Sequence, residues 1–141
     1  SLELKPEIME VRNLRLQEKY RQIKANEVRY ETKFMEDAEY MIVAFGSAAR
    51  IAEKTIELAR AEGIKVGLFR PITLWPFPEK EIKEAAKKLK GILVAEINAG
   101  MMIEDVRLAV EGAVKCAHYG RLGGIVPEPE EMVKALKEEF K

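Results

Sequence analysis

Short apolar runs alternate with amphipathic segments along most of this chain, and this alternation predicts strands followed by helices. The stretch Tyr40–Pro78 contains one complete unit. Residues 41–45 form an apolar run, residues 48–60 carry apolar side chains at helical spacing, and residues 64–69 form a second run. Continuous apolar runs are typical of strands that are buried on both faces of a parallel sheet. The cycle continues with helices predicted at 79–90, 101–111 and 127–140 and strands predicted at 92–95 and 114–119.

This order of elements predicts an α/β fold, a three-layer sandwich with a mostly parallel central sheet, preceded by an N-terminal helix. The segment 7–30 contains no Gly or Pro and has an imperfect apolar stripe. The helix it predicts either packs on this domain or bridges to a partner or a preceding region. Residues 29–34 alternate in part and predict a short edge strand or an extended lead-in. We therefore expect a linker helix and lead-in at 1–37 and an α/β domain at 38–141.

The composition narrows the possible partners and the compartment. The chain has 141 residues, of which 48% are hydrophobic and 34% charged, as is typical of a globular domain. Lys+Arg and Asp+Glu are balanced at 24 each, so we expect neither nucleic acid nor a membrane surface as a partner. No apolar run approaches the roughly 20 residues of a spanning helix. Cys116 is the only cysteine, which excludes an internal disulfide and favours a reducing, cytoplasmic location.

Ligands of open α/β sheets bind beyond the carboxyl ends of the strands. The first segment at such an end is Gly46–Ser47, where Gly46 permits a tight turn and Ser47 is a candidate N-cap. The free N–H groups of the helix that follows could hold a phosphate or carboxylate. The other glycines of a dinucleotide fingerprint are missing, so an ordinary capped turn is the preferred interpretation and a nucleotide- or anion-binding module the alternative.

The second segment, Arg70–Pro78, is a stiff apolar corner with three prolines. Trp75 and Phe77 within it are candidate interface anchors. Arg70 adds a charge at the strand end, and a buried Arg needs a carboxylate partner. Glu96, at the next strand end, is the predicted partner in a structural ion pair.

The third segment is Glu96–Gly100. We expect Glu96 and Asn98 to point to opposite faces if the strand continues, which would make them a poor catalytic pair. His118 and Cys116 share a face of the weakest strand, but nothing in the sequence orients or activates them. No second His or Cys cluster completes a metal site. The sequence therefore predicts no catalytic residue and no metal ligand.

The runs 46–82 and 94–110 resemble the C-terminal part of the alpha subunit of 2-oxoacid:ferredoxin oxidoreductases, the group that includes 2-oxoglutarate and 2-oxoisovalerate oxidoreductases. The fold of the segment is similar to the transketolase C-terminal domain. The resemblance covers about Ala38–Val133, and its most specific parts are the Arg70–Pro78 corner and the Glu96–Gly100 segment. It implies that the N-terminal helix is the linker to a preceding pyrimidine-binding domain.

The resemblance also implies an activity for the whole complex. The family converts a 2-oxoacid and CoA into an acyl-CoA and CO₂, using thiamine diphosphate with Mg²⁺, and passes electrons through iron–sulfur clusters to ferredoxin. Its thiamine diphosphate lies between the pyrimidine-binding domain and the beta subunit.

We therefore expect this chain to bind none of these cofactors itself. A chain with one cysteine cannot supply a Cys₄ cluster. Its expected partners are the beta subunit and possible gamma and delta subunits. Its expected role is assembly and the edge of the substrate or CoA channel, without turnover in isolation. A plain oligomerisation domain, with Trp75 at a subunit contact, is the other alternative.

Overall fold

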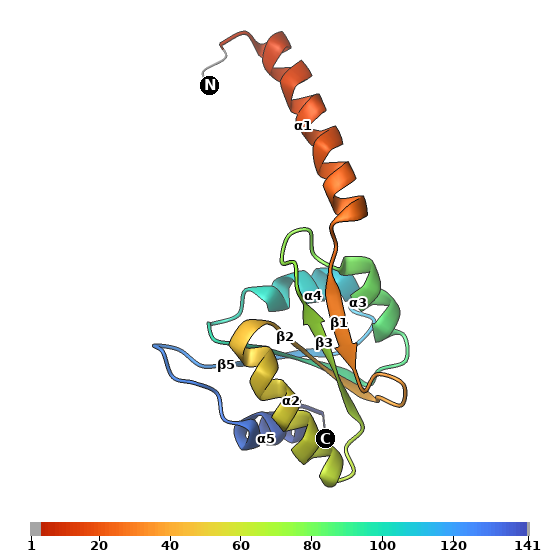
Figure 1. Cartoon of the computed structure of the whole chain (residues 1–141), viewed down its shortest axis with the longest axis vertical. Coiled ribbons are helices and arrows are strands. Elements are labelled where there is room, and N and C mark those ends of the chain that lie inside the picture. Colours follow the sequence, from red (N-terminus) through yellow and green to blue (C-terminus); the bar gives the residue numbers. More distant parts are fainter. Residues whose placement is uncertain (1–3, 141) are drawn as a thin grey trace.

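The structure, a computed structural model, describes residues 4–140. Helices and strands alternate in the predicted order (Figure 1). The elements are α1 (Pro6–Asn26), β1 (Tyr30–Lys33), β2 (Tyr40–Ala44), α2 (Gly46–Ala61), β3 (Val66–Pro71), α3 (Glu79–Ala86), β4 (Gly91–Glu96), α4 (Met102–Val110), β5 (Cys116–Gly120) and α5 (Pro129–Phe140). The largest difference from the predicted bounds is in α3, which ends at Ala86 rather than at residue 90.

The five strands form one sheet in the order β1-β3-β2-β4-β5. Strands β3, β2, β4 and β5 are parallel, and β1 joins β3 antiparallel. Residues 41–44 of β2 and all of β4 are buried because helices cover both faces, which explains their continuous apolar sequence. The edge strand predicted at residues 29–34 is β1, which lies at one edge of the sheet, and β5 lies at the other.

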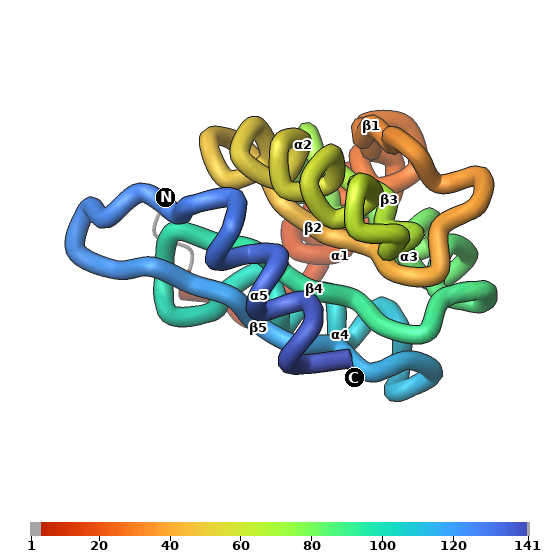
Figure 2. The backbone as a smooth tube through the Cα atoms, turned by 90° about the horizontal axis from the view of Figure 1, so that it is seen from below, coloured from red at the N-terminus to blue at the C-terminus, as the bar shows by residue number. Residues whose placement is uncertain are grey.

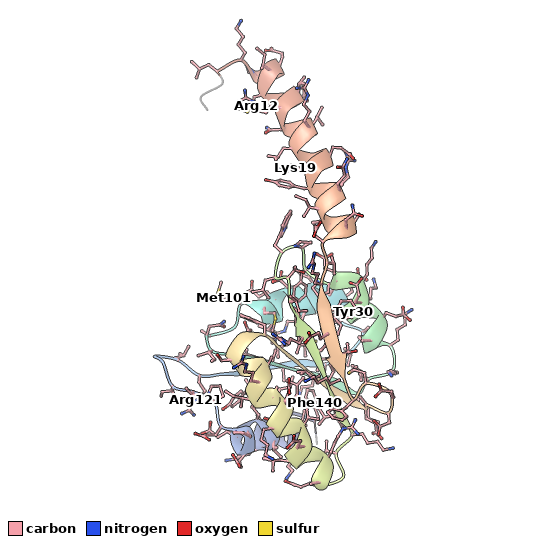
Figure 3. The ribbon with its side chains drawn as sticks, in the orientation of Figure 1. Arg12, Lys19, Tyr30, Met101, Arg121 and Phe140 are labelled. Atoms are coloured by element: carbon pink, nitrogen blue, oxygen red, sulfur yellow. The ribbon has the colours of Figure 1, made fainter. Side chains whose placement is uncertain are left out.

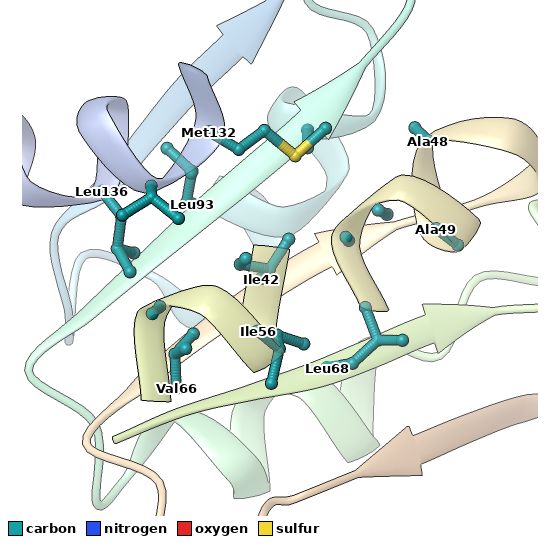
Figure 4. Packing of buried hydrophobic residues seen from close by; sticks show 14 of the residues in the cluster. Ile42, Ala48, Ala49, Ile56, Val66, Leu68, Leu93, Met132 and Leu136 are labelled. Atoms are coloured by element: carbon teal, nitrogen blue, oxygen red, sulfur yellow. The ribbon is translucent and has the colours of Figure 1, made fainter. Parts of the chain in front are cut away.

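Helices α2 and α5 cover one face of the sheet, and α3 and α4 cover the other (Figure 1). On the first face Ile42 and Leu93 of the central strands pack with Ile56 of α2 and Met132 of α5 (Figure 4). Each such side chain stabilises the fold by about 1.5–3 kcal/mol through removal from water. The opposite core is built from Met41, Val43, Phe69, Ile82, Ile92, Val94, Ile103 and Val106. The predicted three-layer α/β sandwich is confirmed.

Helix α1 differs from every other helix. None of residues 6–26, all within the described part of the chain, is buried, and Figure 1 shows α1 projecting away from the sandwich. Arg12 and Lys19 lie along this projecting helix (Figure 3). The edge-to-face contact between Tyr20 and Trp75, with ring centroids 5.4 Å apart, lies near its base. The alternative in which α1 packs on this domain is therefore wrong.

A second projecting feature is the connection between β5 and α5, which extends beyond the rest of the domain (Figure 2). It contains Leu122, Ile125 and Val126, all more than half exposed. Among the described residues, this loop and α1 both project from the sandwich.

Candidate functional site

The loop after β4 is organised by one buried carboxylate. Glu96, only 1% exposed, accepts hydrogen bonds from the backbone N–H groups of Met101, Met102 and Ile103, the shortest being 2.8 Å from Met102. These N–H groups form the start of α4, where a helix leaves its first donors without backbone partners. The negative charge also interacts favourably with the positive end of the helix dipole. Glu96 is therefore a remote N-cap of α4.

Asn98 supports the same cap. Its Nδ2 donates to Glu96 Oε1 at 3.1 Å, and its Oδ1 accepts from the N–H of Gly100 at 2.7 Å. The expectation that Glu96 and Asn98 point to opposite faces is wrong, since residues two apart in an extended segment share a face. Gly100 has φ +104°, a conformation that L side chains rarely adopt, so the turn into α4 uses the freedom of glycine.

The fold brings His118 of β5 to this cap, a contact that sequence reasoning missed. Its Nε2 lies 3.6 Å from Glu96 Oε2 and is buried without a hydrogen-bond partner. Cys116, on the same strand, donates to the Val114 carbonyl at 3.7 Å. Burial raises the pKa of the Cys116 thiol, which keeps it protonated at neutral pH and makes it a weak nucleophile. The pair shows no nucleophilic dyad.

The end of β5 is tied to α5 by a polar cluster. Tyr119 donates its hydroxyl to Glu131 at 2.7 Å, and Arg121 contacts the other oxygen of the same carboxylate at 3.2 Å. Burial, together with the bond to Glu131, raises the pKa of Tyr119 to about 12. The phenol therefore stays neutral at physiological pH and holds β5 against α5.

Arg70 does not pair with Glu96, so that prediction is wrong. Its Nη1 contacts Glu31 Oε2 at 3.0 Å, and Glu31 stands opposite it in the antiparallel pairing of β1 with β3. The antiparallel strand β1, placed by the tertiary fold, supplies this carboxylate. Both side chains are between one-third and one-half exposed, so the pair contributes at most about 1 kcal/mol.

The turn after β2 also differs from the prediction for Ser47. Helix α2 begins at Gly46, which has φ +56°, and Phe45 occupies the cap position in an extended conformation. No side chain caps the helix, and Gly46 and Ser47 are both exposed. Ser47 lies inside the first turn because the helix starts one residue earlier than its sequence pattern indicates, so it is not the N-cap.

The corner after β3 exposes apolar side chains on a fixed backbone. Thr73 Oγ1 donates to the Pro76 carbonyl at 2.8 Å and accepts from the Arg29 N–H at 3.0 Å. Phe77 is half-buried and packs against the core of α3 and α4, whereas Trp75 is 53% exposed. Ile72 and Leu74 are also about half exposed. The apolar segment is anchored through Phe77 and presents Trp75 outward.

Residues 4–140 contain neither a metal-binding cluster nor a membrane-spanning helix. No group of three or more His, Cys, Asp or Glu side chains in this range could hold a metal ion. Within the same described residues, no helix has both the length and the apolar character to cross a membrane.

The model of the family described as pyruvate:ferredoxin oxidoreductase core domain II matches residues 38–132. This match begins just before β2 and includes the corner after β3 and the cap around Glu96. The chain therefore belongs to this family, a domain of the 2-oxoacid:ferredoxin oxidoreductases.

Curated relatives agree with this class. The chain is 42% identical over 126 residues to ketoisovalerate oxidoreductase subunit VorB of Methanothermobacter marburgensis, covering 89% of this chain and 36% of the relative. It is 32% identical over 101 residues to 2-oxoglutarate synthase subunit KorA of the same organism, covering 72% of this chain and 27% of the relative. The chain thus spans about a third of the length of the relatives it matches.

Solved structures show the same fold. The whole chain superposes with a TM-score of 0.84 and 24% identity on a quarter of a chain of 2-oxoglutarate:ferredoxin oxidoreductase from Magnetococcus marinus. A split-gene transketolase, described as an inactive beta4 tetramer, superposes on 78% of this chain, and on 41% of its own, with a TM-score of 0.65 and 17% identity. The predicted transketolase-like architecture is confirmed.

Proposed function

We propose that this chain is the C-terminal, mainly structural domain of the alpha subunit of a thiamine-dependent, cytoplasmic 2-oxoacid:ferredoxin oxidoreductase. The complex would convert a 2-oxoacid and CoA into an acyl-CoA and CO₂ while reducing ferredoxin. Support comes from the family match and from relatives named as ketoisovalerate oxidoreductase and 2-oxoglutarate synthase subunits. In the structural neighbour, 2-oxoglutarate, coenzyme A and succinyl-CoA are bound. The proposal keeps residues 1–37 as linker helix and lead-in and 38–141 as the domain.

The observation that carries the assembly role is the uncovered apolar surface at the base of α1. Trp75 is 53% exposed, Leu74 is 46% exposed, and Tyr20 of α1 makes an edge-to-face contact with Trp75. Large aromatic side chains held on a fixed backbone are the usual anchors of protein interfaces. The Thr73 hydrogen bonds fix this backbone before a partner binds, which reduces the entropy lost on binding.

Helix α1 extends this surface. Its exposed apolar residues are Ile8, Val11, Leu14, Leu16 and Tyr20. A helix gains most of its stability from burying an apolar face, which α1 does not do within this chain. The beta subunit and the remaining part of the alpha subunit are the partners that the proposal places against α1 and Trp75.

The proposal assigns thiamine diphosphate, Mg²⁺ and the iron–sulfur clusters to the other parts of the complex. The side chains at the carboxyl edge do not fit these groups. Glu96, the one buried carboxylate among residues 4–140, already accepts from three N–H groups at the start of α4, and the lone thiol, Cys116, has a raised pKa. No cofactor step is therefore assigned to residues of this chain.

Two measurements test the proposal. Trp75→Ala should weaken binding of the chain to purified partner subunits of a ketoisovalerate oxidoreductase by at least about tenfold, because it truncates the central anchor. Leu108→Ala is the matched control, since Leu108 is 75% exposed on α4, and it should bind like the wild type. Equal binding by both variants would contradict the assembly role at Trp75.

Turnover is the second measurement. The isolated chain, given thiamine diphosphate, Mg²⁺, CoA, 2-oxoisovalerate and an artificial electron acceptor, should produce no acyl-CoA. Acyl-CoA formation by the purified chain alone would overturn the division of labour proposed here.

A further inference from the structure

The outer side of β1 is an unpaired strand edge. β1 pairs with β3 on one side only, and it ends the sheet. The Ile72 N–H donates to the Arg29 carbonyl at 2.9 Å, one step beyond the pairing of Tyr30 with Pro71. Hydrogen-bonded pairs alternate along an antiparallel ladder, so residues 29, 31 and 33 face β3. The backbone N–H and C=O of Tyr30 and Thr32 therefore face outward.

Nothing in the described part of the chain lies over this edge. All four residues of β1 are exposed, and α1 leaves from the N-terminal end of the strand along its direction rather than beside it (Figure 1). Tyr30 lies at the base of α1 (Figure 3). Free strand edges of this kind are templates for pairing with another strand.

We infer that this edge pairs antiparallel with the same edge of a second copy of the chain, about a two-fold axis at Thr32. In this register Thr32 stands opposite its own copy, and its outward N–H and C=O meet those of the second Thr32. Glu31 then stands opposite Lys33 of the second copy, and Lys33 opposite the second Glu31. Cross-strand pairs of opposite charge stabilise an antiparallel pair, and pairs of like charge destabilise it.

The existing ion pairs on the same face extend this complementarity. Glu31 contacts Arg70 at 3.0 Å, and Lys33 Nζ contacts Glu53 Oε1 of α2 at 2.8 Å. Across the two-fold axis the charges would alternate in the order Arg70, Glu31, Lys33 and Glu53, with the last two from the second copy. No two like charges are adjacent in this row. A second copy of β1 therefore matches the charges of this edge, whereas a strand of arbitrary sequence would not.

The paired segment is short for a structural reason. Phe34 leaves the strand with φ +58°, and its carbonyl accepts from Arg60 Nη2 at 2.8 Å. In the register about Thr32, Tyr30 would stand opposite Phe34 of the second copy, so pairing is confined to Glu31–Lys33, and the complex is weak and reversible. This association is independent of the oxidoreductase assignment, because it rests on β1 and the ion pairs of Glu31 and Lys33.

Sedimentation velocity of the 141-residue chain tests the pairing. The weight-average mass should rise toward that of a dimer between about 10 μM and 1 mM, since a small interface gives a weak complex. Lys33→Glu places like charges opposite each other twice and should weaken association by at least about tenfold, and Glu31→Lys should do the same. Lys54→Glu makes the same charge change on the exposed face of α2 and should leave association unchanged.

A mixing experiment separates charge complementarity from misfolding. Lys33→Glu and Glu31→Lys are each expected to stay monomeric, but their equimolar mixture should form heterodimers, because every facing pair is then of opposite charge. Amide exchange of Thr32 should slow in the dimer, and in the mixture, relative to each variant alone. A wild type that stays monomeric through 1 mM, or a mixture that does not associate, would overturn the inference. So would association that is indifferent to Lys33→Glu.

Discussion

Two loops at the same edge of the sheet have opposite characters. The loop after β4 is polar, yet its key carboxylate is 1% exposed and its hydrogen bonds are satisfied within the domain. The corner after β3 is apolar, yet Trp75 is 53% exposed. Polar residues at strand ends are the usual candidates for chemistry, but here they serve the fold. The apolar residues are the ones left available to partners.

The difference has an energetic basis. A buried carboxylate loses several kcal/mol of hydration, and only well-placed donors offset that loss. Glu96 therefore occupies a site where the N-terminus of α4 and Asn98 supply donors, and it cannot also serve a ligand without breaking them. Trp75 is not part of the core, because Phe77 is the side chain that packs the corner against it.

Removal of the Glu96 carboxylate should have the largest effect on stability. Glu96→Ala leaves the N–H groups of Met101, Met102 and Ile103 at the start of α4 without this acceptor, two of them buried, and should lower the free energy of unfolding by about 3 kcal/mol. Urea unfolding followed by circular dichroism measures this change. Glu104→Ala, in the exposed first turn of the same helix, should cost less than about 1 kcal/mol. If Glu96→Ala lowered the free energy of unfolding by less than about 1 kcal/mol, the loop after β4 would not be the structural element that the contrast with the corner after β3 requires.

The turn into α4 should be the next most sensitive position. Gly100→Ala places a methyl group at φ +104° and 3.2 Å from Ile103 Cγ2, and should cost about 2 kcal/mol. Gly124→Ala also has a positive φ, of +82°, but nothing within 4 Å, so it isolates the backbone cost of about 1 kcal/mol. Equal melting temperatures for the two variants would show that crowding beside the cap contributes nothing.

The corner after β3 should give the smallest effect on the isolated chain. Trp75→Ala should change the free energy of unfolding by less than about 0.5 kcal/mol, as is usual for exposed sites. Phe77→Ala should cost more, about 1–2 kcal/mol, because that side chain is half-buried against the core. Thermal unfolding of both variants checks the order. A Trp75→Ala loss as large as that of Phe77→Ala would mean that Trp75 is part of the fold rather than of an interface.

The local pattern of apolar and polar residues predicted most of the helices and strands. The apolar runs of β2, β3 and β4 and the stripes of α2 and α5 follow directly from burial on both faces of a parallel sheet. The corner at Arg70–Pro78 was also recognisable, since Pro and aromatic residues are local signals. An acidic residue followed by Asn and Gly just before a helix, as in Glu96–Gly100, is a signal that could have indicated a remote cap.

The errors about Arg70 and His118 concern contacts between segments that are distant in sequence. Arg70 pairs with Glu31 because β1 returns antiparallel to β3, and His118 reaches Glu96 because β5 lies beside β4. Neither neighbour follows from spacing along the chain. The cap position at Phe45 was missed because Gly46 adopts a positive φ that the sequence permits without requiring.

The sequence by itself determined the class of fold, because the side-chain period of each segment dictates which face must be buried. Only the tertiary structure decided which charged side chains form pairs. It also decided that the Glu96 carboxylate caps the helix that follows it, and that α1 does not pack against the core. These outcomes depend on strand order and helix direction, which bring together groups far apart along the chain. The same dependence leaves Trp75 exposed and the edge of β1 open.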